Sequence, residues 1–302
     1  MPIVARPRFE WRLRSRSLWL GERTLVMGIL NATPDSFSDG GRYLDGKAAL
    51  DHALQMLDEG ADVIDVGGES TRPDAAPVSA EEEQERILPV LRAILAARPE
   101  AILSIDSYHA ETARRGIEAG AEIVNDVSGL LWDEAMARTC AALGCGVVLM
   151  HTRGRPQQWR RVPALAVEDV VPLVLRELEE RAEAGVTAGI ARERIALDPG
   201  FGFGKAHEEN YPLLAQLERL HSLGFPLLIG LSRKGFLRHG LAQASRADDA
   251  IEDATLAANT AAILGGAHIL RVHDVGRTHT AAAIADGIVA AVCPHLADDG
   301  AI

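Results

Sequence analysis

Polar side chains of two chemical kinds stand out in this 302-residue chain. Asp106, Asn125 and Asp198 offer carboxylate or amide groups, and a carboxylate accepts two N–H donors from a guanidine-like ring edge. The other kind is cationic and suits phosphate or carboxylate groups. Its members are Arg72, Arg153, Arg233, Lys234, Arg271 and His273. Together the two kinds predict a site for a flat, nitrogen-rich ring that carries an anion.

The segment Asp198–Lys205 reads DPGFGFGK, in which three glycines alternate with two phenylalanines. Glycines in this arrangement let the backbone come close to a ligand. The segment lacks the closing GKS or GKT of a P-loop, and its glycine spacing differs from that of the dinucleotide fingerprint. We therefore expect it to line a binding site of another kind.

Eight short apolar runs precede or contain these residues, each flanked by polar or glycine-rich chain. They are 25–29, 63–66, 102–105, 123–124, 147–150, 195–197, 227–229 and 269–272. Such continuous apolar runs are typical of parallel strands that are covered on both faces.

Helix-like periodicity separates the runs, at 47–59, 81–97, 168–184, 211–223 and 251–264, and Ser79 with Glu82 predicts a capping box. Strand–helix alternation predicts βαβ units, and eight strands predict a closed (β/α)8 TIM barrel rather than an open sheet.

The loops after the predicted strands are longer and more polar than the loops before them, for example 31–46 and 67–78. In barrels of this class the chemistry lies at the C-terminal ends of the strands. A lone Asp after a strand is often a helix cap. A polar residue after every strand favours one common rim, with Asn31, Asp65, Glu69 and His151 also on it.

The first residues alternate arginines with Phe9, Trp11, Leu13 and Leu18, which predicts a strand or hairpin across the barrel bottom. We expect a single domain over 1–302: an N-terminal extension (1–24), the barrel (25–293) and a tail (294–302).

The composition of the chain restricts its partners and its cellular compartment. A net charge of −12 argues against nucleic-acid binding, and no apolar run is long enough to span a membrane. No signal peptide is visible. Cys140, Cys145 and Cys293 show no paired or zinc-type spacing, which favours reduced thiols and a cytoplasmic enzyme.

Seven segments in order resemble the dihydropteroate synthases, and they extend from about Leu25 to Asp274. The first two are MGILNATPDSFSDGG (27–41) and DVGGESTRP (65–73). The others are SIDS (104–107), VND (124–126), DPGFGFGK (198–205), SRKGF (232–236) and RVHD (271–274). Each is weak alone, but the order and spacing are specific.

The resemblance implies a TIM barrel that joins 6-hydroxymethyl-7,8-dihydropterin diphosphate to p-aminobenzoate and releases diphosphate. Diphosphate would leave first, and the amine would attack a pterin cation. By position, Asp106, Asn125 and Asp198 would hold the pterin, with Lys234 reaching its ring and Arg271 stacking on its face. Asp106, Lys234, Arg271 and Asn31 would be the catalytic residues.

The resemblance also implies Mg²⁺ as cofactor, with Asn31 as its ligand. Asn31, Thr71, Arg271 and His273 would bind the diphosphate. The aminobenzoate site would comprise Phe37, Arg72, Pro73, Phe203 and Gly235. Competitive inhibition by sulfonamides follows from Phe37 and Pro73, and a homodimer formed through late helices is common in the family.

Two departures from the family pattern bear on these roles. After the fifth strand the chain reads MHTRGRP (150–156), so His151 and Arg153 either contact diphosphate or are solvated loop residues. Gly235 replaces a common serine, so a backbone N–H at a helix start would bind the aminobenzoate carboxylate.

Two other functions are kept as alternatives: a methyltetrahydrofolate:corrinoid methyltransferase and a non-catalytic pterin-binding paralogue. A barrel aldolase could use Lys234 as its Schiff-base lysine, but the flanking Arg233 and the Asp and Asn residues of the rim fit a pterin better.

Overall fold

The computed structural model describes residues 2–32, 42–69, 78–244 and 250–292. Eight parallel strands form one sheet, in the order β8-β7-β6-β5-β4-β3-β10-β9. The strands are β3 (Leu25–Asn31), β4 (Val63–Gly67), β5 (Leu103–Asp106), β6 (Ile123–Asp126), β7 (Gly146–Met150), β8 (Ile195–Asp198), β9 (Leu228–Ile229) and β10 (Ile269–Val272). A parallel bridge between Leu197 and Leu227 joins β8 to the segment before β9, so the sheet curls into a nearly closed barrel. Every apolar run predicted as a strand is one.

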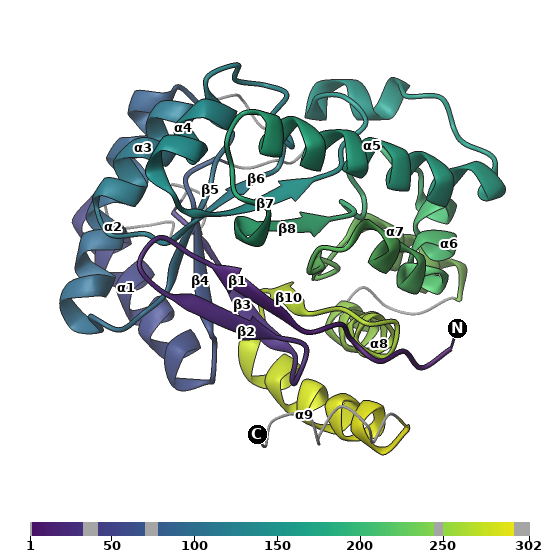
Figure 1. Cartoon of the computed structure of the whole chain (residues 1–302). Coiled ribbons are helices and arrows are strands. Elements are labelled where there is room, and N and C mark those ends of the chain that lie inside the picture. Colours follow the sequence, from purple (N-terminus) through teal and green to yellow (C-terminus); the bar gives the residue numbers. More distant parts are fainter. Residues whose placement is uncertain (1, 33–41, 70–77, 245–249, 293–302) are drawn as a thin grey trace, which may run out of the picture.

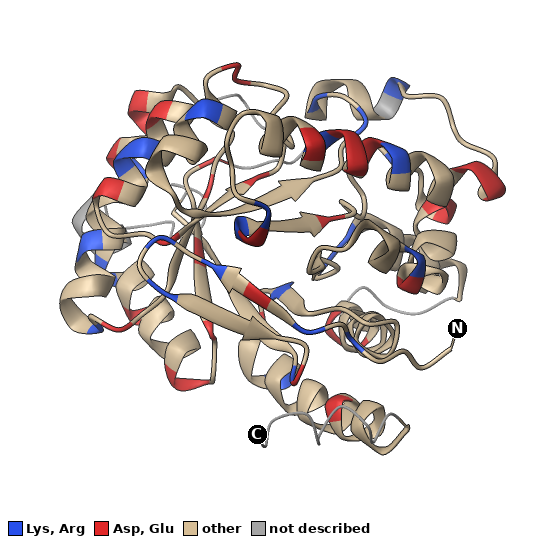
Figure 2. Ribbon diagram, in the orientation of Figure 1, with Lys and Arg blue, Asp and Glu red and all other residues tan. Residues whose placement is uncertain are grey.

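Helices surround the strands (Figure 1), which confirms the TIM-barrel prediction. They are α1 (Arg42–Asp58), α2 (Ala80–Ala97), α3 (Ala110–Glu118), α4 (Met136–Leu143), α5 (Val167–Thr187), α6 (Asn210–Ala215), α7 (Gly235–Gln243), α8 (Ile251–Leu264) and α9 (Val275–Val292). Acidic and basic residues are interspersed over them (Figure 2). None of the helices in the described part of the chain is long and apolar enough to cross a membrane.

Two local predictions were wrong. The predicted helix 211–223 divides into α6 and a 3₁₀ segment, Leu217–Leu223, with Gln216 between them in a non-helical conformation. The buried leucines 213, 214, 217 and 220 fit a 3.6-residue turn as well as the three-residue turn of a 3₁₀ helix, so their spacing does not distinguish the two. The capping box at α2 is half formed: Ser79 Oγ accepts from the Glu82 amide at 3.2 Å, while the Glu82 carboxylate binds Arg86.

An antiparallel hairpin of β1 (Phe9–Arg12) and β2 (Ser17–Leu20) covers the bottom of the barrel, as predicted (Figure 1). Trp11 is fully buried against the first residues of the barrel strands, including Met27 and Ile123. Its indole N–H donates to the Arg194 carbonyl at 2.9 Å. The hairpin therefore closes one end of the barrel, and the opposite end, the barrel mouth, holds the C-terminal ends of the strands.

Candidate active site

Strand register aligns three predicted site residues, together with Gly67, along the barrel mouth. Asn31 pairs with Gly67, Gly67 with Asp106, and Asp106 with Asn125, so one row crosses β3, β4, β5 and β6. Gly67 has no side chain, and a Cβ there would lie 3.4 Å from the Asp106 carboxylate. The row therefore brings an exposed amide, a carboxylate and a buried amide onto one rim.

Arg271 on β10 joins this row from across the barrel. Its Nη2 donates to Asp106 Oδ2 at 2.5 Å, and its Nε donates to Asp65 Oδ2 at 2.6 Å. Asn125 Nδ2 donates to the same Asp65 oxygen at 2.9 Å. Asp65 is fully buried in the middle of β4, and its Oδ1 has no hydrogen-bond partner within the described residues. Asp65 thus orients both a guanidinium and an amide.

These contacts set the charges at the centre of the site. Burial raises the pKa of Asp106 to about 7, although the Arg271 guanidinium opposes this shift. Burial acts to lower the pKa of Arg271, but the carboxylates of Asp65 and Asp106 outweigh it and the pKa is raised. Arg271 therefore keeps its charge at all working pH values, and Asp106 titrates near neutral pH.

Asp198 ends β8 on the same side. It is 5 % exposed, and its Oδ1 accepts from the Gly200 amide at 2.7 Å. A Cβ at Gly230 would lie 3.9 Å from Arg271 Cβ and 4.0 Å from Asp198 Oδ2, so the two side chains flank one space. Burial raises the pKa of Asp198.

Lys234 and Phe203 form a neighbouring pair. Lys234 precedes α7, and its Nζ lies 3.8 Å from the centre of the Phe203 ring, a cation–π contact. Burial lowers the pKa of Lys234 to about 8, against the attraction of Asp198 and Asp106. Gly235 is the first residue of α7, where backbone N–H groups lack helical partners, so it has the predicted place at a helix start.

His273 follows β10 and pairs with a residue of the SRKGF segment. Its Nδ1 lies 2.9 Å from Ser232 Oγ, and Ser232 Oγ also accepts from the His273 amide at 3.3 Å. Ser232 thereby fixes the ring of a predicted diphosphate ligand. Phe37, Thr71, Arg72 and Pro73 lie outside the described residues.

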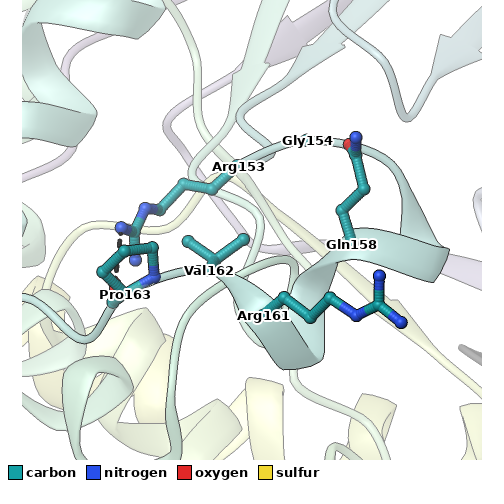
Figure 3. A pocket seen from close by; sticks show the side chains of 6 residues that line it. All are labelled: Arg153, Gly154, Gln158, Arg161, Val162 and Pro163. Atoms are coloured by element: carbon teal, nitrogen blue, oxygen red, sulfur yellow. Dashed lines mark hydrogen bonds between the residues drawn. The ribbon is translucent and has the colours of Figure 1, made fainter.

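In the variant segment after β7, the His151 side chain points away from the barrel mouth. The His151 side chain is fully buried, with Nε2 3.1 Å from Glu177 Oε2 on α5, and burial lowers its pKa to about 4. Arg153 donates to the carbonyls of Gly204 and Pro163. Figure 3 shows it turned toward Pro163 along a cavity of about 490 Å³ formed by residues 153–163. His151 is thus neither a diphosphate contact nor a solvated loop residue.

Sequence reasoning gave no role to two buried charges at this end of the barrel. Asp65 was noted only as a rim residue, although a carboxylate in the middle of an apolar strand signals an internal anchor. Lys205, the last residue of DPGFGFGK, is 7 % exposed and donates to backbone carbonyls. Within the described residues, no group of three or more His, Cys, Asp or Glu side chains is arranged to hold a metal ion.

Comparisons with known proteins agree with this geometry. A family model described as "Pterin binding enzyme" matches residues 27–273. The dihydropteroate synthase of Escherichia coli is 43% identical over 268 residues, which cover 88% of this chain and 92% of that protein.

Two solved structures are similar over nearly their whole length. The Xanthomonas albilineans dihydropteroate synthase with 4-aminobenzoic acid has a TM-score of 0.83 and 41% identity, covering 92% of this chain and 98% of that one. The Yersinia pestis dihydropteroate synthase with a sulfonamide drug has a TM-score of 0.83 and 40% identity, covering 93% and 99%.

Proposed function

The chain belongs to the pterin-binding enzyme family and is a dihydropteroate synthase, and we propose that the residues of its barrel mouth divide this reaction among them. The enzyme condenses 6-hydroxymethyl-7,8-dihydropterin diphosphate with p-aminobenzoate to give 7,8-dihydropteroate and diphosphate. The observation that carries the assignment of roles is the contact of Arg271 with Asp106, beside Asp198 and Lys234.

In this proposal the pterin lies among Asp106, Asn125 and Asp198. Their carboxylate and amide groups match the donors and acceptors of its ring edge. Lys234 donates to the ring, and Arg271 lies over its face. Arg271 contacts one carboxylate oxygen of Asp106, Oδ2, so the guanidinium also holds this carboxylate in place.

Asn31, Thr71, Arg271 and His273 bind the departing diphosphate. The donor set fits Mg²⁺: Asn31 presents one exposed amide on the rim, and Mg²⁺ typically takes few protein ligands and completes its shell with water and substrate phosphates. When bound, the ion supplies charge neutralisation to the leaving oxygens. His273, oriented by Ser232, and Arg271 add donors on the same side.

As the diphosphate leaves, positive charge develops on the exocyclic carbon and spreads into the pterin. The ionised Asp106 stabilises this cation electrostatically. The neutral arylamine then attacks the carbon and loses a proton, so no covalent bond to the enzyme forms.

The arylamine lies beside Phe203, with Phe37, Arg72 and Pro73 completing its site. The N–H groups at the start of α7, at Gly235, bind its carboxylate. Sulfonamides resemble p-aminobenzoate in shape, and we expect them to compete with it for this site. Reaction rates that do not change at saturating sulfonamide would contradict this.

A homodimer and a cytoplasmic setting complete the proposal. Ile284, Ile288 and Val292 recur every four residues on α9 and are 41–68 % exposed, so they form an apolar stripe that a second copy could cover. Cys140 and Cys145 are buried free thiols, as expected in a reducing compartment.

The test is to incubate the protein with the pterin diphosphate, Mg²⁺ and p-aminobenzoate, and to measure dihydropteroate and diphosphate. Asp106→Asn should lower turnover far more than it weakens pterin binding. Equal turnover would remove Asp106 from the mechanism. Absence of diphosphate release would favour the corrinoid methyltransferase, and pterin binding without any product would favour a non-catalytic paralogue.

A further inference from the structure

A buried ammonium lies directly beneath the glycine loop, which comprises residues 199–204. The Lys205 side chain is 7 % exposed. Its Nζ donates to the carbonyls of Gly200 at 2.7 Å, Phe203 at 3.4 Å and His151 at 3.5 Å. Burial lowers the pKa of Lys205 to about 7. The ammonium form has three N–H donors, so these three carbonyls use all of them and none is left for a substrate.

The loop above this ammonium has little stiffness of its own. Gly200, Gly202 and Gly204 all have positive φ, between 65° and 79°. Glycine adopts this conformation readily but adopts many others as well, so the glycines themselves do not fix the backbone. Other side chains also bind the loop: Asn210 Oδ1 accepts from the Gly202 amide at 2.7 Å, Asp198 Oδ1 accepts from the Gly200 amide at 2.7 Å, and Arg153 Nη1 donates to the Gly204 carbonyl at 3.1 Å. The shape of the loop therefore depends on a few polar side chains, and among the two cationic ones Lys205 binds two loop carbonyls whereas Arg153 binds one.

The loop determines where Phe203 lies. The Phe203 ring contacts Lys234 Nζ on one side and the Trp159 ring on another, with 4.9 Å between the ring centres. Asp198, in contrast, belongs to β8 and is held by pairing with β7. A loosened loop would displace the Phe203 ring and leave the Asp198 backbone in place.

The rarity of lysine in this chain suggests that position 205 requires a lysine rather than an arginine. Only three lysines, Lys47, Lys205 and Lys234, occur among 31 basic residues. A compact ammonium can satisfy three carbonyls around one point, whereas a planar guanidinium presents its donors in a fork.

We propose that Lys205 is a positioning residue that holds the glycine loop by its three carbonyl contacts and so places Phe203 against the arylamine. This inference rests on the role given to Phe203 under the proposed function. It concerns arylamine affinity and not the chemical step, since Lys205 has no free donor for a substrate.

The test compares Lys205→Met, which keeps the length but removes all donors, with Lys205→Gln, which keeps two donors. For Lys205→Met we expect KM for p-aminobenzoate to rise about tenfold or more, while the Kd for the pterin diphosphate measured without arylamine changes less than threefold. Lys205→Gln should fall between Lys205→Met and wild type. Lys47→Met, which removes an exposed lysine paired with Asp51, is the matched control and should change neither constant.

The outcomes separate two failures. If the wild-type protein makes no dihydropteroate, the proposed function fails. If the wild type is active but Lys205→Met leaves both constants unchanged, or weakens both equally, the positioning role is overturned.

If both Lys205 variants unfold, NMR of the ¹⁵N-lysine-labelled wild type gives the answer, since only three ammonium signals are present. The Lys205 Nζ protons should exchange with water far more slowly than those of Lys47 and should shift when p-aminobenzoate joins the pterin complex. Exchange as fast as that of Lys47, or no shift, would overturn the proposal.

Discussion

The pH dependence of kcat/KM for the pterin diphosphate tests the charges proposed for the site. The mechanism needs Asp106 ionised and Lys234 protonated. Burial raises the pKa of Asp106 to about 7 and lowers that of Lys234 to about 8. Because kcat/KM reports the free enzyme, its profile should be a bell with limbs near pH 7 and pH 8.

The two pKa values fix the size of the effect. Asp106 loses its charge as pH falls through about 7, and Lys234 loses its charge as pH rises through about 8. The fraction of enzyme with both groups charged is about 0.6 at pH 7.5, and about 0.1 at pH 6 and at pH 9. We therefore expect kcat/KM to fall about sixfold on either side of the maximum.

Variants assign the acid limb. Asp106→Asn should lower kcat/KM and abolish the limb near pH 7. Glu83→Gln is the matched control, because burial raises the pKa of Glu83 to about 7 as well, and this carboxylate accepts from Ser107 Oγ at 2.7 Å. The control should keep the limb. Steady-state rates from pH 5.5 to 9.5 in constant ionic strength provide the measurement, and a limb that persists in Asp106→Asn would refute the reasoning.

Three further predictions concern stability. Burial lowers the pKa of His151 to about 4 from an ordinary value near 6.5, so between these pH values the unfolded chain binds a proton that the folded protein does not. The unfolding free energy, measured by urea titration, should therefore fall by about 3 kcal/mol from pH 6.5 to pH 4. The fall should be smaller in His151→Gln. Gly200→Ala should cost about 3 kcal/mol or more, since its Cβ would lie 1.9 Å from the His151 carbonyl oxygen, whereas Gly235→Ser, with open space around its Cβ, should change unfolding by less than about 0.5 kcal/mol. Trp11→Ala should cost about 3–5 kcal/mol in thermal and chemical unfolding and leave KM unchanged, because Trp11 is buried at the end of the barrel opposite the mouth.

The strands could be predicted because a parallel barrel strand is covered on both faces and reads as a continuous apolar run. The run 102–105, for example, corresponds to β5, Leu103–Asp106. The helix expected at 211–223 shows the limit of periodicity. Its buried leucines fit a 3.6-residue and a 3-residue turn equally well, and only packing against the barrel decides between them.

The rim residues could be predicted because polar residues at strand ends converge on one mouth, as the register of Asp106 with Asn125 shows. The direction in which each side chain points could not be predicted. His151 follows β7 as Asn31 ends β3, yet it points outward to Glu177 on α5, because neighbouring positions along a strand face opposite sides. The inward reach of Arg271 to Asp65 likewise depends on a flexible side chain finding a buried carboxylate.

The short strand β9 leaves a seam in the barrel wall. It has two residues, and the wall there closes through the Leu197–Leu227 bridge, with the Leu197 amide bound to the Pro226 carbonyl at 2.9 Å. Asp198 lies on one side of this seam and Lys234 on the other. A pterin bound to both residues would therefore link the two sides of the part of the wall that has the fewest strand hydrogen bonds. Deuterium uptake at the Leu197 amide should then slow when a pterin binds at the barrel mouth, although the ligand does not contact that amide.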